Sequence, residues 1–192
     1  MNIDGHDYQL FKDYDTGKFK YLTFEGKIAY LAARVDKILI GPCREAMKTS
    51  GNDLGLVLAT AVCAGISAAS TFYNGRRANP GDDKKLFTDF VMCYMQLPHQ
   101  KPEPRMSWVE WLYRDVRCGL AHSFTIMNGG IEYEVSPAYT EIKNYGPEIE
   151  PRELLRDFAE GWSKYLSDVK RDGPVQGLGA KFAVRFDQIF YD

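Results

Sequence analysis

Apolar residues recur at intervals of three and four positions along most of the chain, which is the spacing that buries one face of an α-helix. We therefore predict a mainly all-α fold, a helical bundle of about five helices. With their capping residues, the expected helices are 23–48, 53–73, 82–95, 107–122 and 150–172. Residues 181–191 also show helical spacing of their aromatic positions, with a strand as the alternative.

Polar residues and prolines at the ends of these segments predict where the helices begin and break. Pro42 is expected to kink or break the first helix, which then continues to about Lys48. Asp82 or the residue after it is expected to cap the third helix. Ser107 is followed three positions later by Glu110, the spacing of a capping box, so the fourth helix is expected to begin there.

The segment from Leu54 to Tyr73 contains no charged residue and is long enough to raise the question of a membrane span. Its composition is dominated by Ala, Gly, Ser and Thr, however, and no other segment could join it in a bilayer. An uncharged helix with rows of small residues suits the centre of a bundle, or part of a dimer interface, because neighbouring helices can approach it closely. We predict that Asp53 caps this helix and that the chain has no membrane segment.

Two segments outside the helices show different patterns. Residues 1–23 are rich in aromatic side chains and contain Asp-Thr-Gly turn chemistry, which predicts an extended or short-stranded arm packed on the main body. After the fourth helix, two alternating runs surround Asn128-Gly129-Gly130, which predicts a β-hairpin over 123–135. A Pro- and Gly-punctuated loop is expected over 136–150, and C-terminal helices over 151–192.

The length of 192 residues suits a single domain spanning 1–192. With 24 basic and 26 acidic residues the net charge is −2, which argues against a general coat of positive charge for non-specific nucleic-acid binding but leaves a local cleft open. Arg76 and Arg77, in the loop after the second helix, could touch phosphates or simply be solvated. The same two interpretations apply to a basic neighbourhood before and within the fourth helix, formed by His99, Lys101, Arg105, Arg114 and Arg117.

The cysteines and the chain's first residues indicate a reducing compartment. Cys43, Cys63, Cys93 and Cys118 are widely spaced and lie in apolar helical contexts, so we expect each to behave as a small buried hydrophobe. No Cys-x-x-Cys pair and no second histidine stands at ligand spacing, so neither a zinc site nor another metal or cofactor is expected. The polar, acidic start lacks the apolar core of a signal sequence, which favours a cytoplasmic location.

The strongest candidate chemistry is Arg117-x-x-x-x-His122, at the end of the aromatic-rich fourth helix. Arginine keeps its charge and holds phosphate oxygens with a fixed fork of donors, whereas histidine titrates near neutrality and can move protons. Together they suit cleavage of an RNA phosphodiester. A base takes the proton from the ribose 2′-hydroxyl, a cation stabilises the charge on phosphorus, and no metal is needed.

The spacing of these two residues sets a geometric condition. Five positions at ~100° each place Arg117 and His122 roughly 140° apart around a regular helix, so they do not share a narrow face. The helix could change course at Gly119, because glycine tolerates conformations that other residues avoid. The other solution is a second copy of the motif from a symmetric partner, which would bring the groups together across an interface.

The stretch that carries this motif resembles a known family. Leu112-Tyr113-Arg114-Asp115-Val116-Arg117-Cys118-Gly119-Leu120-Ala121-His122 is similar to the Arg-x4–6-His signature of HEPN domains, which are all-α bundles. The helical pattern from Phe24 to Val135 fits as well, although only the short motif is specific. One position departs from the pattern, because the residue after the arginine is often polar in active members and is Cys118 here.

The resemblance implies an activity, an assembly and a set of site residues. HEPN domains commonly dimerise with two motifs facing each other, and active members are metal-independent endoribonucleases, often in toxin–antitoxin, phage-defence or CRISPR-associated settings. It carries over Arg117 as the phosphate-binding cation and His122 as the proton-transfer group. Substrate binding is expected from Arg114, Tyr113 and Arg105, the product is a 2′,3′-cyclic phosphate, and the expected partners are RNA, a second copy and an antitoxin protein.

Two other interpretations stay open at this point. One is a catalytically inactive HEPN-like dimeric module that binds RNA or a protein partner, which Cys118 and the near-neutral charge favour. The other is a helical domain of unrelated function. In that case His122 would serve as a C-terminal dipole partner or a packed core residue, and Arg117 would serve the structure.

Overall fold

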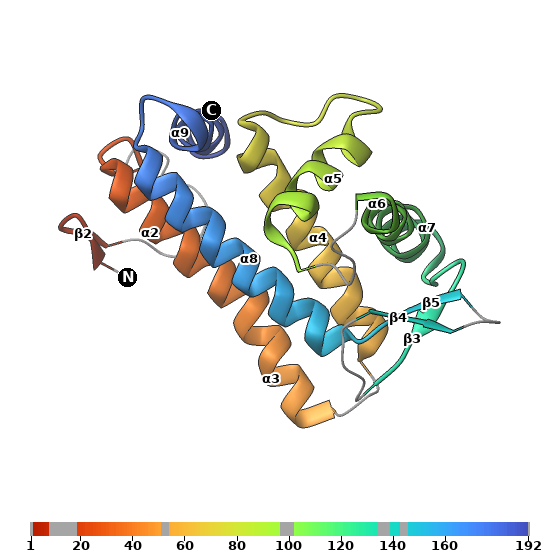
Figure 1. The fold of residues 1–192 in the computed structure, drawn as a ribbon. Coiled ribbons are helices and arrows are strands. Elements are labelled where there is room, and N and C mark those ends of the chain that lie inside the picture. The colour runs from red at the N-terminus through yellow and green to blue at the C-terminus, as the bar shows by residue number, and fades with distance from the viewer. Residues whose placement is uncertain are drawn as a thin grey trace.

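A computed structural model of the chain describes residues 2–7, 19–50, 54–96, 102–133, 139–142 and 146–191, and it confirms the mainly all-α fold (Figure 1). The α-helices are α2 (Phe24–Val35), α3 (Gly41–Ser50), α4 (Gly55–Asn74), α5 (Asp83–Tyr94), α6 (Pro102–Trp111), α7 (Cys118–Ser123), α8 (Pro151–Asp172) and α9 (Gly177–Phe190). Two π-helical turns, η1 (Asp36–Ile40) and η2 (Leu112–Arg117), join α2 to α3 and α6 to α7 without a break.

The predicted break at Pro42 takes the form of a π-helical turn. A proline inside a helix removes a backbone donor and clashes with the carbonyl four residues earlier, which here belongs to Ile38. The chain is wound more widely over these residues, and Gly41 N–H donates to the carbonyl of Asp36, five residues back. The helical run therefore continues through Pro42 to Ser50. At its start, Thr23 caps α2 by accepting from Gly26 N–H at 3.0 Å.

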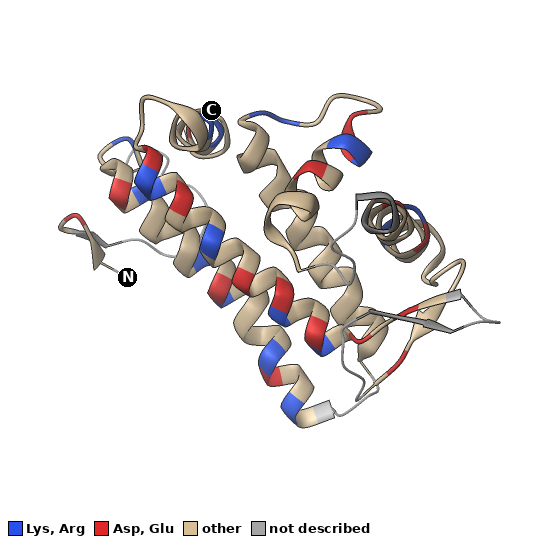
Figure 2. Ribbon diagram, viewed as in Figure 1, with Lys and Arg blue, Asp and Glu red and all other residues tan. Residues whose placement is uncertain are grey.

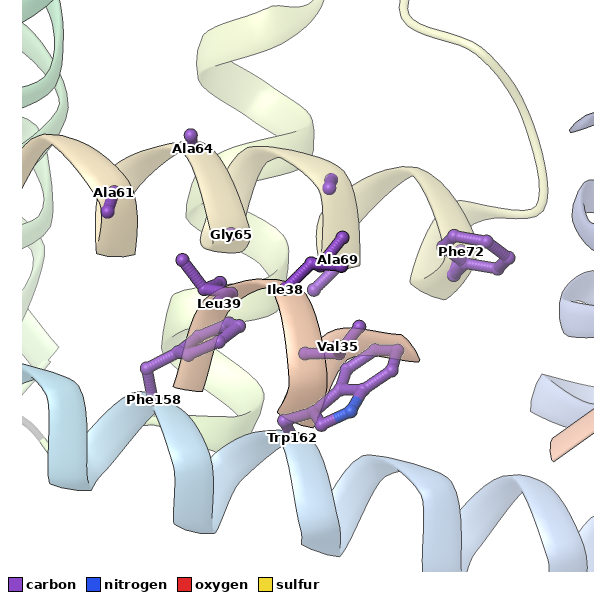
Figure 3. Close-up of a pocket in the computed structure, with 11 residues that line it drawn as sticks. Val35, Ile38, Leu39, Ala61, Ala64, Gly65, Ala69, Phe72, Phe158 and Trp162 are labelled. Atoms are coloured by element: carbon purple, nitrogen blue, oxygen red, sulfur yellow. The ribbon is translucent and has the colours of Figure 1, made fainter. Parts of the chain in front are cut away.

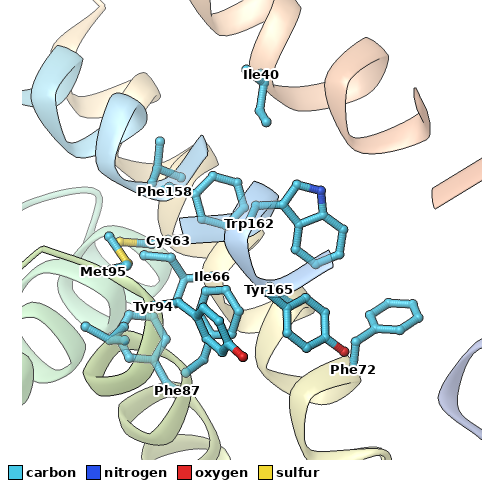
Figure 4. Close-up of a cluster of buried hydrophobic side chains, with 14 of the residues drawn as sticks. Ile40, Cys63, Ile66, Phe72, Phe87, Tyr94, Met95, Phe158, Trp162 and Tyr165 are labelled. Carbon is cyan, nitrogen blue, oxygen red and sulfur yellow. The ribbon is translucent and has the colours of Figure 1, made fainter. Parts of the chain in front are cut away.

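Helix α4 lies at the centre of the bundle, as its uncharged sequence predicts, and packs against α5, α8 and α9. It is the one helix in the described part of the chain that is long and apolar enough to cross a membrane, and half of that stretch is buried by its neighbours. Gly65 permits this packing, because a Cβ there would lie 2.5 Å from a methyl group of Leu39 and 3.0 Å from the ring of Phe158. Figure 4 shows the buried core cluster, to which α4, α5 and α8 all contribute aromatic side chains.

The C-terminal segment is a helix rather than the alternative strand, and α9 begins at Gly177. Its aromatic face closes the end of the bundle that also receives the N-terminal arm. Phe19 of the arm is buried against Tyr30, Phe186 and Phe190. Before it, β1 (Asn2–Ile3) and β2 (His6–Asp7) pair antiparallel, as a short-stranded arm should, while 8–18 lie outside the described residues.

A small sheet follows the continuous helical run α6, η2 and α7, which carries Arg117 and His122 and is called the motif helix from here on. The sheet is not formed by the residues that the sequence indicates. β4 (Tyr139–Ile142) and β5 (Gly146–Ile149) form the antiparallel hairpin, and β3 (Gly130–Ile131) pairs parallel to β5. The hairpin expected over 123–135 is therefore wrong in its position, and its last two residues lie outside the description. The run after His122 is instead held by side chains of the motif helix, as shown below.

One predicted helix start is wrong, and one residue at its predicted N-cap position makes no capping bond. Ser107 lies inside α6, which begins at Pro102, so it is not an N-cap, and Glu110 instead pairs with Lys84 at 2.8 Å. Asp82 stands at the N-cap of α5, but its side chain makes no capping bond and pairs with Arg76. Asp53, expected to cap α4, lies outside the described residues. At α8 the prediction holds, because Glu150 accepts from Glu153 N–H at 2.7 Å.

Candidate functional site

The motif lies where the fourth helical run changes its winding. Residues 112–117 form the π-helical turn η2, in which Cys118 N–H donates to the carbonyl of Tyr113, five residues back. Arg117 is the last residue of this turn, and α7 then continues as a regular α-helix to Ser123. The helix therefore changes course before Arg117, and not at Gly119 between the two motif residues.

Arg117 is half-buried between the motif helix and the central helix α4. Its guanidinium lies over the Tyr113 ring, 5.5 Å from the centroid, and its Nη1 lies 3.8 Å from Cys118 Sγ. On the α4 side it lines a small hollow together with Ser67, Ser70, Thr71, Ala78, Asp83 and Leu86. These contacts fix the direction of the arginine, which points toward α4 and α5.

His122 occupies a different side of the same helix. It is exposed, one turn after Cys118, on the part of α7 that faces away from the core residues Val116 and Leu120. Because α7 is regular, the angle between Arg117 and His122 stays close to the ~140° expected from the sequence. Within the ranges that the structure describes, no hydrogen bond joins the two side chains, and their separation around the helix keeps them apart in one copy of the chain.

The expected substrate-binding residues are only partly placed. Tyr113 is half-buried and packs its ring on Phe87 at 5.4 Å between centroids, and burial raises the pKa of its hydroxyl. Arg114 is exposed and donates to Asp115, which raises the pKa of the guanidinium. The backbone of Arg105 belongs to α6, but its side chain is not described, and His99 and Lys101 lie outside the described residues.

A buried carboxylate that the sequence analysis missed holds the end of the motif in place. Asp115 is fully buried, and its Oδ1 accepts from Asn128 Nδ2 at 2.7 Å while its Oδ2 accepts from Arg114 at 2.6 Å. The Asp115 carbonyl also accepts from Met127 N–H at 3.1 Å. Trp111 donates from its indole N–H to the Asn128 carbonyl. These bonds fold the chain after His122 back along the motif helix.

Gly119 has a role that differs from the predicted one. It lies in the regular helix α7, where a Cβ would stand 2.4 Å from the Thr125 carbonyl oxygen. Its missing side chain therefore allows residues 125–127 to lie directly against the helix. The glycine serves the close return of the chain, rather than a bend between Arg117 and His122.

The residue that starts this return, Phe124, combines two unfavourable features. Its backbone is left-handed, with φ 54° and ψ 28°, a region that residues with a side chain rarely adopt. Its ring is 87% exposed, and Met127 nearby in sequence is 51% exposed. An exposed aromatic group held by strained backbone two residues after His122 marks this surface as a candidate contact region.

Two of the four cysteines are buried and two are not, and all four are free thiols. Cys43 and Cys63 are buried, as expected, and burial raises the pKa of the Cys63 thiol to about 12. Cys93 is exposed and Cys118 is half-exposed, so the expectation of burial is wrong for these two. Over the described ranges, no three His, Cys, Asp or Glu side chains are grouped in a way that could hold a metal ion.

A second and larger hollow lies away from the motif. It has a volume of about 290 Å³ and is enclosed by η1, α4 and α8, with apolar residues such as Leu39, Ala64 and Phe158 along it (Figure 3). None of its lining residues comes from the motif helix, and its lining carries no charged group. It therefore offers none of the side chains that phosphodiester cleavage requires.

Comparison of the chain with models of known protein families, with curated proteins and with solved structures gives no match. A function is therefore inferred from the residues of the motif and from their surroundings.

Proposed function

We propose that the chain is a metal-independent endoribonuclease of the HEPN type that acts as a dimer with paired Arg117/His122 motifs. The observation that carries the proposal is the arrangement at the end of the motif helix. An exposed histidine and a guanidinium held at a fixed place lie within five residues, next to a strained and exposed surface. A toxin or phage-defence effector working in the cytoplasm, controlled by an antitoxin protein, is the setting that the resemblance suggests.

The chemistry assigns one role to each residue of the pair. His122 takes the proton from a ribose 2′-hydroxyl, and the 2′-oxygen attacks phosphorus. Arg117 stabilises the negative charge that gathers on the phosphoryl oxygens. The 5′-oxygen leaves and takes a proton from a solvent water molecule. The products are a 2′,3′-cyclic phosphate and a free 5′-hydroxyl.

A second copy is required because Arg117 and His122 lie on different sides of one helix. A two-fold interface presents the same surface from both copies, so any residue near the axis meets its own counterpart. A contact through Phe124 and Met127 would place two His122 side chains close to that axis. It would also give the exposed ring a partner and thereby account for the strained backbone that holds it.

The direct test is cleavage of a mixed RNA pool in EDTA. The parent protein is expected to cut and to leave 2′,3′-cyclic ends, and His122→Ala is expected to lose about 10²–10⁴-fold in rate, the range that general acid–base catalysis supplies. Both proteins are compared by circular dichroism, since His122 is exposed and its replacement should leave the fold intact. Equal cleavage rates for the parent and His122→Ala would rule out the assigned role.

A prediction about assembly follows from Phe124. Phe124→Ala is expected to weaken self-association at least about tenfold, or roughly 1.4 kcal/mol, because buried aromatic anchors dominate interface energies. Val175→Ala is the matched control, since Val175 is also 87% exposed but lies in the loop before α9. Sedimentation velocity over a range of protein concentrations measures both. Equal dimer fractions in the two variants would place the interface elsewhere.

One observation favours a second candidate function, a catalytically inactive HEPN-like dimeric module that binds RNA or a protein partner. Arg117 packs on Tyr113 and beside Cys118, the position where a polar residue is typical of active members. Binding of RNA without cleavage, unchanged by His122→Ala, is the result expected for such a module. Cleavage by the parent in EDTA excludes it.

A further inference from the structure

Three arginines from separate segments gather around the last turns of α4. Arg77 belongs to the loop after α4, Arg117 to η2, and Arg185 to α9. Thr71 connects them, because Arg185 Nε donates to its Oγ1 at 3.2 Å and Thr71 also lines the hollow that holds Arg117. Ala78, which directly follows Arg77, lines the same hollow. We call Arg77, Arg117 and Arg185 the arginine cluster.

Figure 2 shows basic positions on α9 and on the loop after α4 at this end of the molecule, where α4 and α9 are in contact. Two other basic residues nearby have acidic partners, whereas Lys181 of α9 lies over the Tyr73 ring, 5.7 Å from its centroid. Arg76 pairs with Asp82 at 2.5 Å, and Lys85 pairs with Asp89 at 2.7 Å. In the arginine cluster, by contrast, Arg77 and Arg185 have no acidic partner among the described residues.

Arg77 and Arg185 form no ion pair with any residue in the described ranges. Arg185 bonds only neutral groups, Thr71 and the Gln188 side chain at 3.3 Å, and Arg77 is exposed. Burial and, after it, the like charge of Arg77 lower the pKa of Arg185, so the two guanidinium groups are close enough to repel each other. A bound anion would relieve this repulsion, and Asp83, in the hollow beside Arg117, is the nearby carboxylate that would oppose it.

The hydroxyl groups that line the hollow are already used as donors within α4. Ser67, Ser70 and Thr71 each donate to a carbonyl of the preceding turn, so their protons are not available to an anion, and Thr71 accepts from Arg185. The hollow itself has a volume of about 30 Å³, which suits a water molecule rather than a phosphate. An anion would therefore lie at its mouth, against the guanidinium groups, and guanidinium forks match phosphate oxygens well.

We propose that the arginine cluster binds phosphate groups of an RNA backbone, which extends the substrate contact from the motif helix across the end of α4 to α9. This proposal rests on the proposed function for its choice of RNA, and free phosphate is the other source of the same chemistry. Arg117 belongs both to the Arg117/His122 motif and to the arginine cluster. The cluster would therefore guide the RNA strand toward the phosphodiester that reacts. Arg77 and Arg185 would contribute to binding and not to the chemical step.

The test measures RNA binding by fluorescence anisotropy at several salt concentrations, in EDTA, with His122→Ala as the background so that the RNA stays intact. For a single-stranded RNA the slope of log affinity against log salt falls by about 0.7 for each phosphate that the protein no longer binds. Arg77→Gln is expected to lower the slope by about 0.7, and Arg77→Gln with Arg185→Gln by about 1.4. Arg44→Gln is the matched control, an exposed arginine on α3 with no described ion pair.

Each outcome decides between the proposals. A slope equal to that of Arg44→Gln in both variants overturns the arginine cluster as an RNA site, whether or not the parent cuts RNA. If Arg77→Gln lowers the slope but the parent protein does not cut RNA, the arginine cluster stands as an RNA-binding site and the nuclease proposal fails. Absence of RNA binding overturns the RNA assignment. In that case, stabilisation by millimolar inorganic phosphate over chloride, abolished in Arg77→Gln, identifies a free-phosphate site.

Discussion

A mixture of Arg117→Ala and His122→Ala proteins is expected to cleave RNA, although neither variant does so alone. In one copy the two side chains lie on different sides of the motif helix, so the proposed site combines groups across a two-fold interface. A mixed dimer contains one site with both intact residues and one site with neither. Half of the dimers are mixed after random exchange, so the expected activity is about a quarter of that of the parent protein.

The experiment depends on subunit exchange and on a control for it. The two variants are mixed at high concentration, diluted slowly, and assayed in EDTA against each variant alone at the same total concentration. The same mixture carrying Phe124→Ala in both chains should recover much less activity, because the dimer forms less readily. Two inactive variants whose mixture also stays inactive would show that each site takes both residues from one copy.

Much of the fold could be predicted from sequence because helical periodicity is a local property. The uncharged run 54–73 predicted the central helix, and the spacing of Leu154, Phe158 and Trp162 predicted α8. The hairpin was misplaced for the opposite reason. Asn128-Gly129-Gly130 has the local chemistry of a turn, but Asn128 itself is bound to Asp115 and Trp111, which stand 13 and 17 residues earlier in the chain.

The candidate site was predicted in its residue types but not in its arrangement. The ~140° separation of Arg117 and His122 follows from spacing alone, and α7 retains it. The π-helical turn that ends at Arg117 could not be predicted, because residues 112–117 contain no proline or glycine that would mark a change of winding. Asp115 could have been found, because it stands between Leu112 and Val116 on the buried face, where a charged residue needs partners.

Replacement of Asp115 by alanine is expected to destabilise the protein strongly. The change removes the buried acceptor of Asn128 and leaves that amide, at 2.7 Å in the parent, without its partner. Asn128 is exposed and can bond water once its partner is lost, so the expected cost is that of the missing bond to a charged acceptor, about 1.5–3 kcal/mol. For a chain of this size the melting temperature should fall by roughly 3–12 °C.

A double-mutant cycle isolates the bond to Asn128. Asp115→Ala and Asn128→Ala together should cost less than the sum of the two, by about 1 kcal/mol or more, because the two groups share one interaction. Asp89→Ala is the matched control, since Asp89 pairs with exposed Lys85 at the surface and its removal should cost under about 0.5 kcal/mol. Additive costs in the cycle would mean that Asp115 does not hold the chain after His122. Coupled costs would make Asp115 the residue that fixes both ends of the proposed site, because it lies two positions before Arg117 and anchors the segment that follows His122.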